Sequence, residues 1–401
     1  MTERPLRVMW LLNHTTARQF EVPMLKRIGV REVFLPKRIP ADPAFRSASI
    51  DWSEDQHLSI PADDLAILNA ADWYDDPGRE AWEIANKHFD IAFFILLKTA
   101  FFRSMTRHFG GAKIWRAYGL PEESYSDSLT WRSHREGLLA SPQALDSRFW
   151  FGQAYAHLEN RESPYLQKRA LFFPAGLPDA RLDDKWSGTD KRIFFICPDL
   201  GFSTYYQKVY SEFEKTFSGL PYVVGGAQPA PVPDSHVLGF QPSEVHRRNM
   251  QELRVMFYHG ADPNHVHYHP FEAIRAGMPL VFMAGGLLDK LGGNELPGRC
   301  RTQAEARSKI ERILNDDRRL IAEIRTSQPQ LLEPLMVESC EPSWRSSIRK
   351  VLEELRTDGS PVVDKRGRRK RVAVIVPVKY RGGSLRGAKL LARAIQDGSR
   401  A

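Results

Sequence analysis

The chain has 401 residues, more than the about 250–300 at which a single hydrophobic core usually divides, so we expect two domains. A hydrophobic content of 42% excludes disorder of the whole chain, and three widely spaced cysteines argue against a disulfide framework or a thiolate zinc site. The net charge is +8, but residues 365–371 alone carry six positive charges, so a surface-wide nucleic-acid site is not expected.

Export signals and membrane spans are not expected either. Residues 1–7 are polar, and the apolar stretch 8–12 has only the length of a strand. The most apolar run, 91–98, is far shorter than the about 20 residues that a transmembrane helix needs. We therefore expect a soluble, cytoplasmic protein. The basic segment 365–371 is expected to be a solvated linker, with attachment to the inner-membrane surface or attraction to an acidic substrate as the alternatives.

The first half of the chain alternates between strand and helix patterns. Residues 7–13 form a continuous apolar run, typical of a strand covered on both faces. The other expected elements are a helix at 20–28, a strand at 32–36, helices at 63–71 and 78–88, a strand at 89–97, a Phe/Arg-rich helix, and a strand at 111–119. Such alternation predicts parallel βαβ units, so residues 1–175 are expected to form a Rossmann-like domain.

The second half restarts this alternation after a Pro/Gly-containing hinge at 171–179. The expected elements are strands at 192–198, 222–226, 237–239, 255–259 and 279–283, helices at 205–216, 242–253 and 270–276, and closing helices from about 303 to 355. Residues 176–356 are thus predicted to form a second Rossmann-like domain. The predicted fold class is α/β, with two tandem Rossmann-like domains facing a cleft, where open sheets bind ligands at the carboxyl ends of their strands.

Residues 357–401 are predicted to be a basic linker followed by an incomplete strand–helix unit. The run 371–379 has the pattern of a buried strand, and a short helix is expected to end near 395. One strand and one helix cannot bury a core alone. The unit therefore either adds to an existing sheet or begins a third domain of a longer protein, and we expect the tandem-domain core to be complete by about Leu355.

The most informative stretch is 255–283, where a strand runs through a polar loop into a helix that begins at Pro270. Because proline is favoured at the first helical position, His269 is expected at the N-cap. Unpaired amides and the positive end of the helix dipole would stabilise a phosphate there. Glu272 lies in the same turn and would repel a phosphate, unless it accepts hydrogen bonds from ligand hydroxyls such as those of a ribose.

The pattern PFEAIRAGMPLV, from Pro270 to Val281, resembles the donor-binding segment of GT-B glycosyltransferases of the large retaining superfamily. The resemblance implies that Glu272 binds the nucleotide ribose. That superfamily typically has a second glutamate eight residues earlier, where this sequence has Asn264, so retention and inversion both stay open. The pair His269-Pro270 is similar to the motif of sialyltransferase-like and Kdo-transferase-like GT-B enzymes, which implies that His269 approaches the donor phosphate.

Other residues are donor-site candidates for weaker reasons. Gly201 and Ser203 follow the first strand of the second domain, where a phosphate-facing loop is expected, and the resemblance implies that Lys208 neutralises a diphosphate. The full set of candidate donor contacts is Gly201, Ser203, Lys208, His259, His269, Pro270, Phe271 and Glu272. A satisfied strand-end histidine at 259, a plain N-cap at 269 and a helix-dipole carboxylate at 272 are the structural alternatives.

The catalytic candidates are His14 and Glu21. His14 ends the first strand, and an imidazole with an ordinary pKa near about 6.5 can take a proton from an acceptor hydroxyl. The resemblance to inverting GT-B enzymes implies such a base on a loop of the first domain. A structural or acceptor-lining role for His14 is the alternative. Arg116 is also expected in the cleft.

A metal site is not expected, although His259, His265, His267 and His269 are close in sequence. Alternate imidazoles on an extended loop can share one face, but no thiolate or second ligand cluster accompanies them.

These features together predict a metal-independent glycosyltransferase without a cofactor. The resemblance further implies transfer of a sugar from a nucleotide-sugar donor to a saccharide or lipid-linked acceptor, in surface polysaccharide biosynthesis. A nucleotide-sugar 2-epimerase is one alternative, although its typical acidic cluster is not evident. The other is a non-catalytic nucleotide-sugar-binding module of a larger glycosyltransferase assembly.

Overall fold

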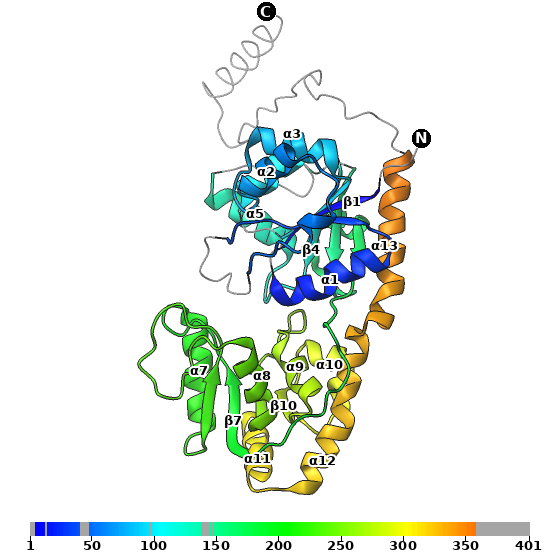
Figure 1. Ribbon diagram of the computed structural model, residues 1–401. Helices are drawn as coiled ribbons and strands as arrows, with labels where there is room; N and C mark the ends of the chain where they lie inside the picture. The colour runs from blue at the N-terminus through cyan, green and yellow to red at the C-terminus, as the bar shows by residue number, and fades with distance from the viewer. Residues whose placement is uncertain are drawn as a thin grey trace, which may run out of the picture. The chain divides into compact units, whose positions relative to one another are not determined.

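The computed structural model describes residues 5–12, 14–40, 48–95, 98–137, 145 and 147–357. Within them the strands form two parallel sheets (Figure 1). The first sheet has six strands in the order β2-β1-β3-β4-β5-β6, and the second has five in the order β11-β10-β9-β7-β8. The strands of the first sheet are β1 (Arg7–Leu11), β2 (Glu32–Phe34), β3 (Ile91–Phe94), β4 (Ala112–Ala117), β5 (Phe149–Gln153) and β6 (Ala170–Phe172). Those of the second are β7 (Asp190–Ile196), β8 (Tyr222–Gly225), β9 (Leu253–Tyr258), β10 (Leu280–Met283) and β11 (Arg299–Cys300).

Helices connect and cover these strands, as parallel pairing requires. The first half contains α1 (Thr15–Arg27), η1 (Asp55–His57), α2 (Ala62–Ala70), α3 (Gly78–His88), α4 (Thr99–His108), α5 (Tyr125–Arg135), η3 (Leu158–Arg161) and α6 (Pro164–Lys168). The second contains α7 (Thr204–Thr216), α8 (Ser243–Glu252), α9 (His269–Ala276), α10 (Leu287–Lys290), η4 (Gly293–Glu295), α11 (Gln303–Leu314), α12 (Arg318–Ser327), η5 (Gln328–Leu335) and α13 (Val337–Thr357). The predicted α/β architecture with two Rossmann-like sheets is therefore confirmed.

The strands are apolar because both faces of each sheet are covered. All residues of β1, β3 and β5 are buried, and apart from Arg7 at the start of β1 and Gly152 and Gln153 at the end of β5 they form continuous hydrophobic runs that do not alternate with polar residues. Strand β5 and helix α5 were not among the expected elements. The expected strand at 237–239 is reduced to a single bridge between Val224 and Val237.

The last described helix, α13, packs against the first sheet. Trp344 of this helix is fully buried, and its indole Nε1 donates a hydrogen bond to the Pro174 carbonyl at 2.9 Å. It shares one core with the strand residues Trp10, Phe93 and Ile114. Figure 1 shows α13, in orange, running beside α1 of the first half. The packing thus assigns α13 to the core of the first sheet, although the sequence placed residues up to 356 in the second domain.

The predicted basic linker and strand–helix unit at 357–401 lie, apart from residue 357, outside the described residues. None of the helices in the described part of the chain combines the length and apolarity that crossing a bilayer requires.

Candidate functional site

The loop from β9 to α9 carries the motif singled out in the sequence. Helix α9 begins at His269, so its N-cap is Tyr268 and not His269 as expected. The amides of Phe271 and Glu272 both donate to the Tyr268 carbonyl, at 3.0 and 3.1 Å, and Pro270 has no amide hydrogen. An anion at the first turn would therefore meet the positive end of the helix dipole and the His269 amide. We had expected several free amides there, so the turn has fewer hydrogen-bond donors for a phosphate than the sequence suggested.

Imidazole rings gather around this turn. The ring of His269 lies 5.3 Å, centroid to centroid, from the rings of both Tyr258 and His267. Burial lowers the pKa of His269 well below its ordinary value, and the neighbouring imidazoles lower it further. Burial also lowers the pKa of His259 to about 4. Its Nδ1 atom is buried and has no hydrogen-bond partner among the described residues. Both rings are therefore uncharged at neutral pH, and the orphaned Nδ1 is a feature typical of functional sites.

Glu272 is the member of the motif that faces away from the core. Its side chain is 25% exposed, and its Oε2 lies 3.4 Å from Nε2 of His246 on α8. Phe271 is only 1% exposed and packs into the core of the second sheet, and Pro270 is buried too. Neighbouring positions on a helix point about 100° apart, so Phe271 and Glu272 cannot share a face. Of these three expected donor contacts, Glu272 alone offers a ligand an accessible side chain.

His14 approaches the same turn from the first half of the chain. Its ring centroid lies 5.8 Å from that of Tyr268. Burial lowers the pKa of His14, while the carboxylates of Glu21 and Glu272 act in the opposite direction. His14 is also the N-cap of α1, where its Nδ1 accepts a hydrogen bond from the Ala17 amide at 3.3 Å. An Nδ1 that accepts is unprotonated, so the neutral ring carries its proton on Nε2.

Glu21, the second catalytic candidate, is 1% exposed and bound on every side. Its Oε1 accepts hydrogen bonds from Arg116 Nε at 3.1 Å, Arg116 Nη2 at 2.5 Å and the Tyr118 hydroxyl at 2.5 Å. Its Oε2 accepts one from Trp10 Nε1 at 2.9 Å. This carboxylate balances a buried guanidinium, and removing a substrate proton would break that pair. The geometry therefore assigns Glu21 and Arg116 a structural role as a buried ion pair.

The loop after β7 holds the remaining candidates. Ser203 is the N-cap of α7, and its hydroxyl accepts from the Tyr206 amide at 3.4 Å, so it carries a capping role as it stands. Gly201 is exposed, and a Cβ there would lie 2.8 Å from the Cβ of Ala230. Lys208 is exposed and forms no ion pair with any residue that the structure describes. Its charge is therefore available to an anionic ligand.

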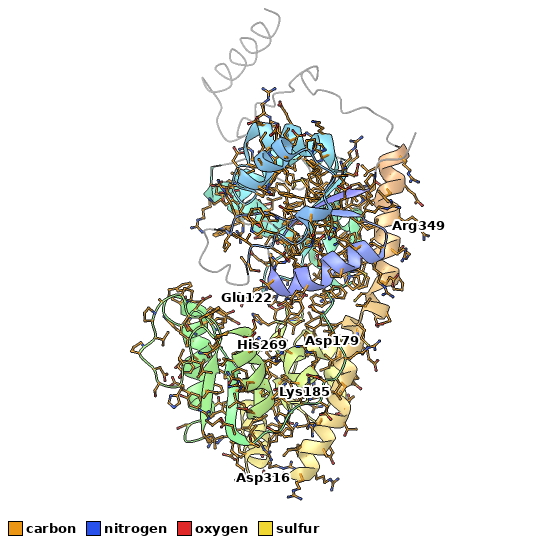
Figure 2. The ribbon with its side chains drawn as sticks, viewed as in Figure 1. Glu122, Asp179, Lys185, His269, Asp316 and Arg349 are labelled. Atoms are coloured by element: carbon orange, nitrogen blue, oxygen red, sulfur yellow. The ribbon has the colours of Figure 1, made fainter. Side chains whose placement is uncertain are left out.

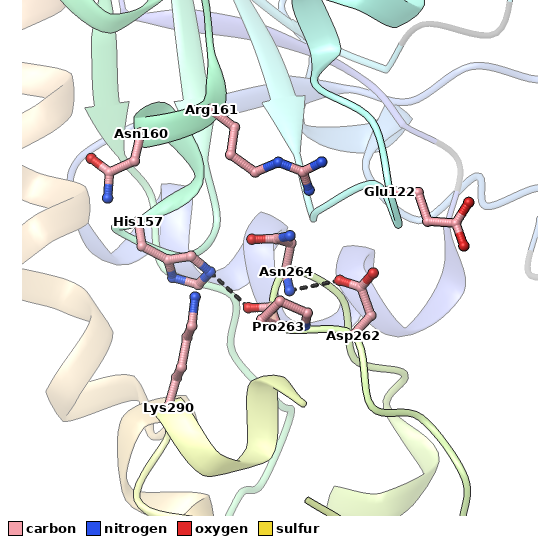
Figure 3. Close-up of a pocket in the computed structure, with 8 residues that line it drawn as sticks. All are labelled: Glu122, His157, Asn160, Arg161, Asp262, Pro263, Asn264 and Lys290. Carbon is pink, nitrogen blue, oxygen red and sulfur yellow. Dashed lines mark hydrogen bonds between the residues drawn. The ribbon is translucent and has the colours of Figure 1, made fainter. Parts of the chain in front are cut away.

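A pocket that the sequence did not reveal has a volume of about 440 Å³. Both halves of the chain line it (Figure 3). Its lining residues are Glu122, His157, Asn160, Arg161, Asp262, Pro263, Asn264 and Lys290. We call it the Arg161–Lys290 pocket. Asp262, Pro263 and Asn264 belong to the same β9–α9 loop that leads to His269, which Figure 2 labels together with Glu122. Burial raises the pKa of Tyr205 at the start of α7, and carboxylates including those of Asp262 and Glu122 raise it further.

Among the described residues, no group of three or more histidine, cysteine, aspartate or glutamate side chains is arranged to hold a metal ion. The rings of His265, His267 and His269 do lie close together, with neighbouring centroids 4.8 and 5.3 Å apart. His267 and His269 stack on each other, whereas His265 meets His267 edge-on, and Tyr258 meets both His267 and His269 edge-on.

No protein-family model matches the chain, and no curated protein sequence is similar to it. Solved structures do match. The O-GlcNAc transferase of Thermobaculum terrenum, solved as a mutant, has a TM-score of 0.50 and 16% identity over 88% of this chain and 68% of its own. The T4 phage BGT in complex with UDP and Mn2+ has a TM-score of 0.49 and 10% identity, over 87% of this chain and 100% of its own. CalG4, the calicheamicin glycosyltransferase, has a TM-score of 0.42 and 11% identity, over 88% of this chain and 100% of its own.

The likeness to the O-GlcNAc transferase spans both sheets and their helices. The chain therefore has the GT-B fold of glycosyltransferases, with two Rossmann-like sheets whose carboxyl edges hold the candidate site.

Proposed function

We propose that this protein is a glycosyltransferase, which moves a sugar from a nucleotide-sugar donor to a saccharide or lipid-linked acceptor. The observation that carries the proposal is the approach of His14, from the first half of the chain, to Tyr268, the N-cap of the helix α9 that carries Glu272. In a GT-B fold the two sheets bind different substrates, and the reaction takes place where residues from both sheets meet.

Donor recognition is proposed to rest on Glu272 and the uncharged imidazoles. Glu272 is exposed enough to accept hydrogen bonds from two neighbouring ribose hydroxyls, and a carboxylate is well suited to such a pair. His269 stands at the positive end of the α9 dipole, where a phosphate oxygen is stabilised. Lys208 is proposed to add a mobile positive charge. The donor diphosphate would thus bind through neutral donors and one lysine.

His14 is proposed to contact the reacting groups first as a hydrogen-bond donor. While Nδ1 accepts the hydrogen bond from the Ala17 amide, Nε2 carries the proton. The side of the ring that faces away from the helix therefore has a hydrogen-bond donor and not a lone pair. To act as a base, the ring must release the Ala17 amide and accept a proton at Nδ1. We propose that acceptor binding provides this release.

We propose that the enzyme acts in surface polysaccharide assembly, on the cytoplasmic side of the inner membrane. The basic segment 365–371 would hold the enzyme near lipid-linked acceptors, since each lysine or arginine near an anionic surface contributes about 1 kcal/mol.

Replacing Glu272 with alanine should weaken nucleotide-sugar binding about ten- to a hundred-fold, because a charge-assisted hydrogen bond contributes about 1.5–3 kcal/mol. The variant should fold, since the side chain is partly exposed. Calorimetric titration with the donor measures the effect. Glu244→Ala is the matched control, because Glu244 is an exposed carboxylate in the first turn of the neighbouring helix α8. Equal donor affinity in folded Glu272→Ala and wild type would remove Glu272 from the site.

Exhaustive chelation of divalent ions should leave donor turnover unchanged. The positive charge that stabilises the leaving nucleotide is proposed to come from Lys208 and the α9 dipole, not from a cation. Nucleotide release before and after treatment with a chelator is the measurement. Activity that disappears on chelation and returns with one divalent ion would contradict this proposal.

A further inference from the structure

The Arg161–Lys290 pocket is large enough for a ligand of its own. Its volume of about 440 Å³ falls in the range of about 300–1,000 Å³ that is usual for small-molecule sites. The loop after β4 contributes Glu122, and the segment after β5 contributes His157, Asn160 and Arg161. The β9–α9 loop forms the facing wall, and Lys290 ends α10. The carboxyl edges of both sheets therefore supply its walls.

Hydrogen bonds hold the β9–α9 loop, which forms one wall of the pocket, in place. His157 Nε2 donates to the Pro263 carbonyl at 2.9 Å, which joins the two walls (Figure 3). The Asn264 amide donates to the Asp262 carboxylate at 2.7 Å, and the Leu287 amide donates to the Asp262 carbonyl at 2.8 Å. Asn264 is buried, and a Cβ on Gly119 would lie only 1.7 Å from its carbonyl oxygen. This close backbone contact leaves the β9–α9 loop little freedom to move.

The two cationic side chains that line the pocket are not paired with other described residues. Arg161 and Lys290 are exposed, and neither side chain forms a hydrogen bond or an ion pair with another residue that the structure describes. By contrast, Arg116, Arg169 and Arg254 are each bound by carboxylates or carbonyls. Two uncommitted cations beside one cavity favour an anionic ligand.

The pocket also has acidic lining residues. Figure 3 shows Glu122 and Asp262 on one side, His157 with Lys290 on the other, and Arg161 between them. Burial and the nearby Lys290 lower the pKa of His157, so its ring does not add a positive charge at neutral pH. A simple anion would be repelled by the carboxylates, whereas a sugar can place its hydroxyls against them. The two-sided lining thus fits a molecule with both an acidic group and hydroxyls.

We propose that this pocket binds an acidic sugar of the acceptor, with its carboxylate or phosphate held by Arg161 and Lys290 and its hydroxyls by Glu122 and Asp262. This proposal rests on the proposed function, because it assigns the class of acceptor to the same enzyme. The pocket then selects acidic glycans over neutral ones.

The first test measures direct binding of three probe sugars by saturation-transfer NMR. The probes are methyl glucuronide, methyl glucoside 6-phosphate and neutral methyl glucoside, each titrated into the full-length protein. We expect the two acidic probes, or one of them, to bind at least about tenfold more tightly than the neutral one, since a charge-assisted hydrogen bond is worth that much. Whichever acidic probe binds identifies carboxylate or phosphate as the acidic group. Equal affinity for all three probes, or no binding of either acidic probe, would overturn the proposal.

The second test uses variants of the two cations. Arg161→Gln/Lys290→Gln should lose the preference for the acidic probe, whereas the control Lys168→Gln should keep it, because exposed Lys168 lies in the same segment but outside the pocket. An unchanged preference in the double variant would refute the role of the two cations. Nucleotide-sugar binding is measured in the same samples. Donor binding without acidic-probe binding defeats this inference alone, whereas acidic-probe binding without donor binding defeats the proposed function and leaves an acidic-sugar site without the role of acceptor site.

Discussion

Replacing Arg116 with methionine should lower the free energy of unfolding by about 3–5 kcal/mol, because it leaves the buried carboxylate of Glu21 without its countercharge. Both residues are 1% exposed. The pair is joined by two hydrogen bonds, and the guanidinium also donates to the Gly152 carbonyl at 2.8 Å. Denaturant unfolding followed by circular dichroism measures the loss.

Two controls separate charge burial from loss of volume. Arg192→Met removes an exposed arginine paired with Asp190 and should change stability by less than about 1 kcal/mol. Adding Glu21→Leu to Arg116→Met should restore part of the lost stability, because the orphaned charge is then gone. If Arg116→Met left stability unchanged while abolishing turnover, Glu21 would be a free catalytic carboxylate and the structural role assigned to it would be wrong.

Truncating Trp344 to alanine should cost about 3–5 kcal/mol, since it opens a cavity in the core of the first sheet. The indole is fully buried, lies 4.9 Å from the ring of Phe173 and 6.0 Å from that of Phe93, and donates to the Pro174 carbonyl. Trp131→Ala is the control, because Trp131 is 56% exposed and its removal should be nearly neutral. Thermal and denaturant unfolding provide the measurement.

An unchanged stability of Trp344→Ala would show that α13 is not part of the core of the first sheet. The guanidinium of Arg116 lies 5.3 Å from the centre of the Trp344 ring. The two substitutions are therefore neighbours, and their effects should not add when combined. Additive losses in the double variant would indicate that the two side chains act independently.

The strands could be predicted from the sequence because parallel sheets bury both faces and leave continuous apolar runs such as 7–11 and 91–94. The docking of α13 could not. Its residues have a helical pattern that shows an apolar face but not the sheet against which that face packs. Its hydrogen-bond partners Pro174 and Phe172 lie 170 and 175 residues away in the chain, so the choice between the two sheets is a tertiary effect.

Some of the candidate site residues follow from local sequence patterns, and others depend on the fold. Glu272 could be recognised from a local pattern, and the structure places it on the accessible face of α9. Glu21 could not be assigned from local sequence, because Arg116 and Tyr118, which bind it, lie 95 and 97 residues away. Arg161 ends η3 and Lys290 ends α10, and neither belongs to a motif, so only the fold brings them to one pocket.

The most direct test of the proposed glycosyltransferase is to incubate the full-length protein with a panel of nucleotide-sugars and acidic and neutral oligosaccharides, with mass spectrometry of the products. We expect one donor to release its nucleotide and add one sugar to an acceptor, with little or no transfer by Glu272→Ala. An epimerised nucleotide-sugar, or donor binding without any consumption, would contradict the proposed transfer reaction.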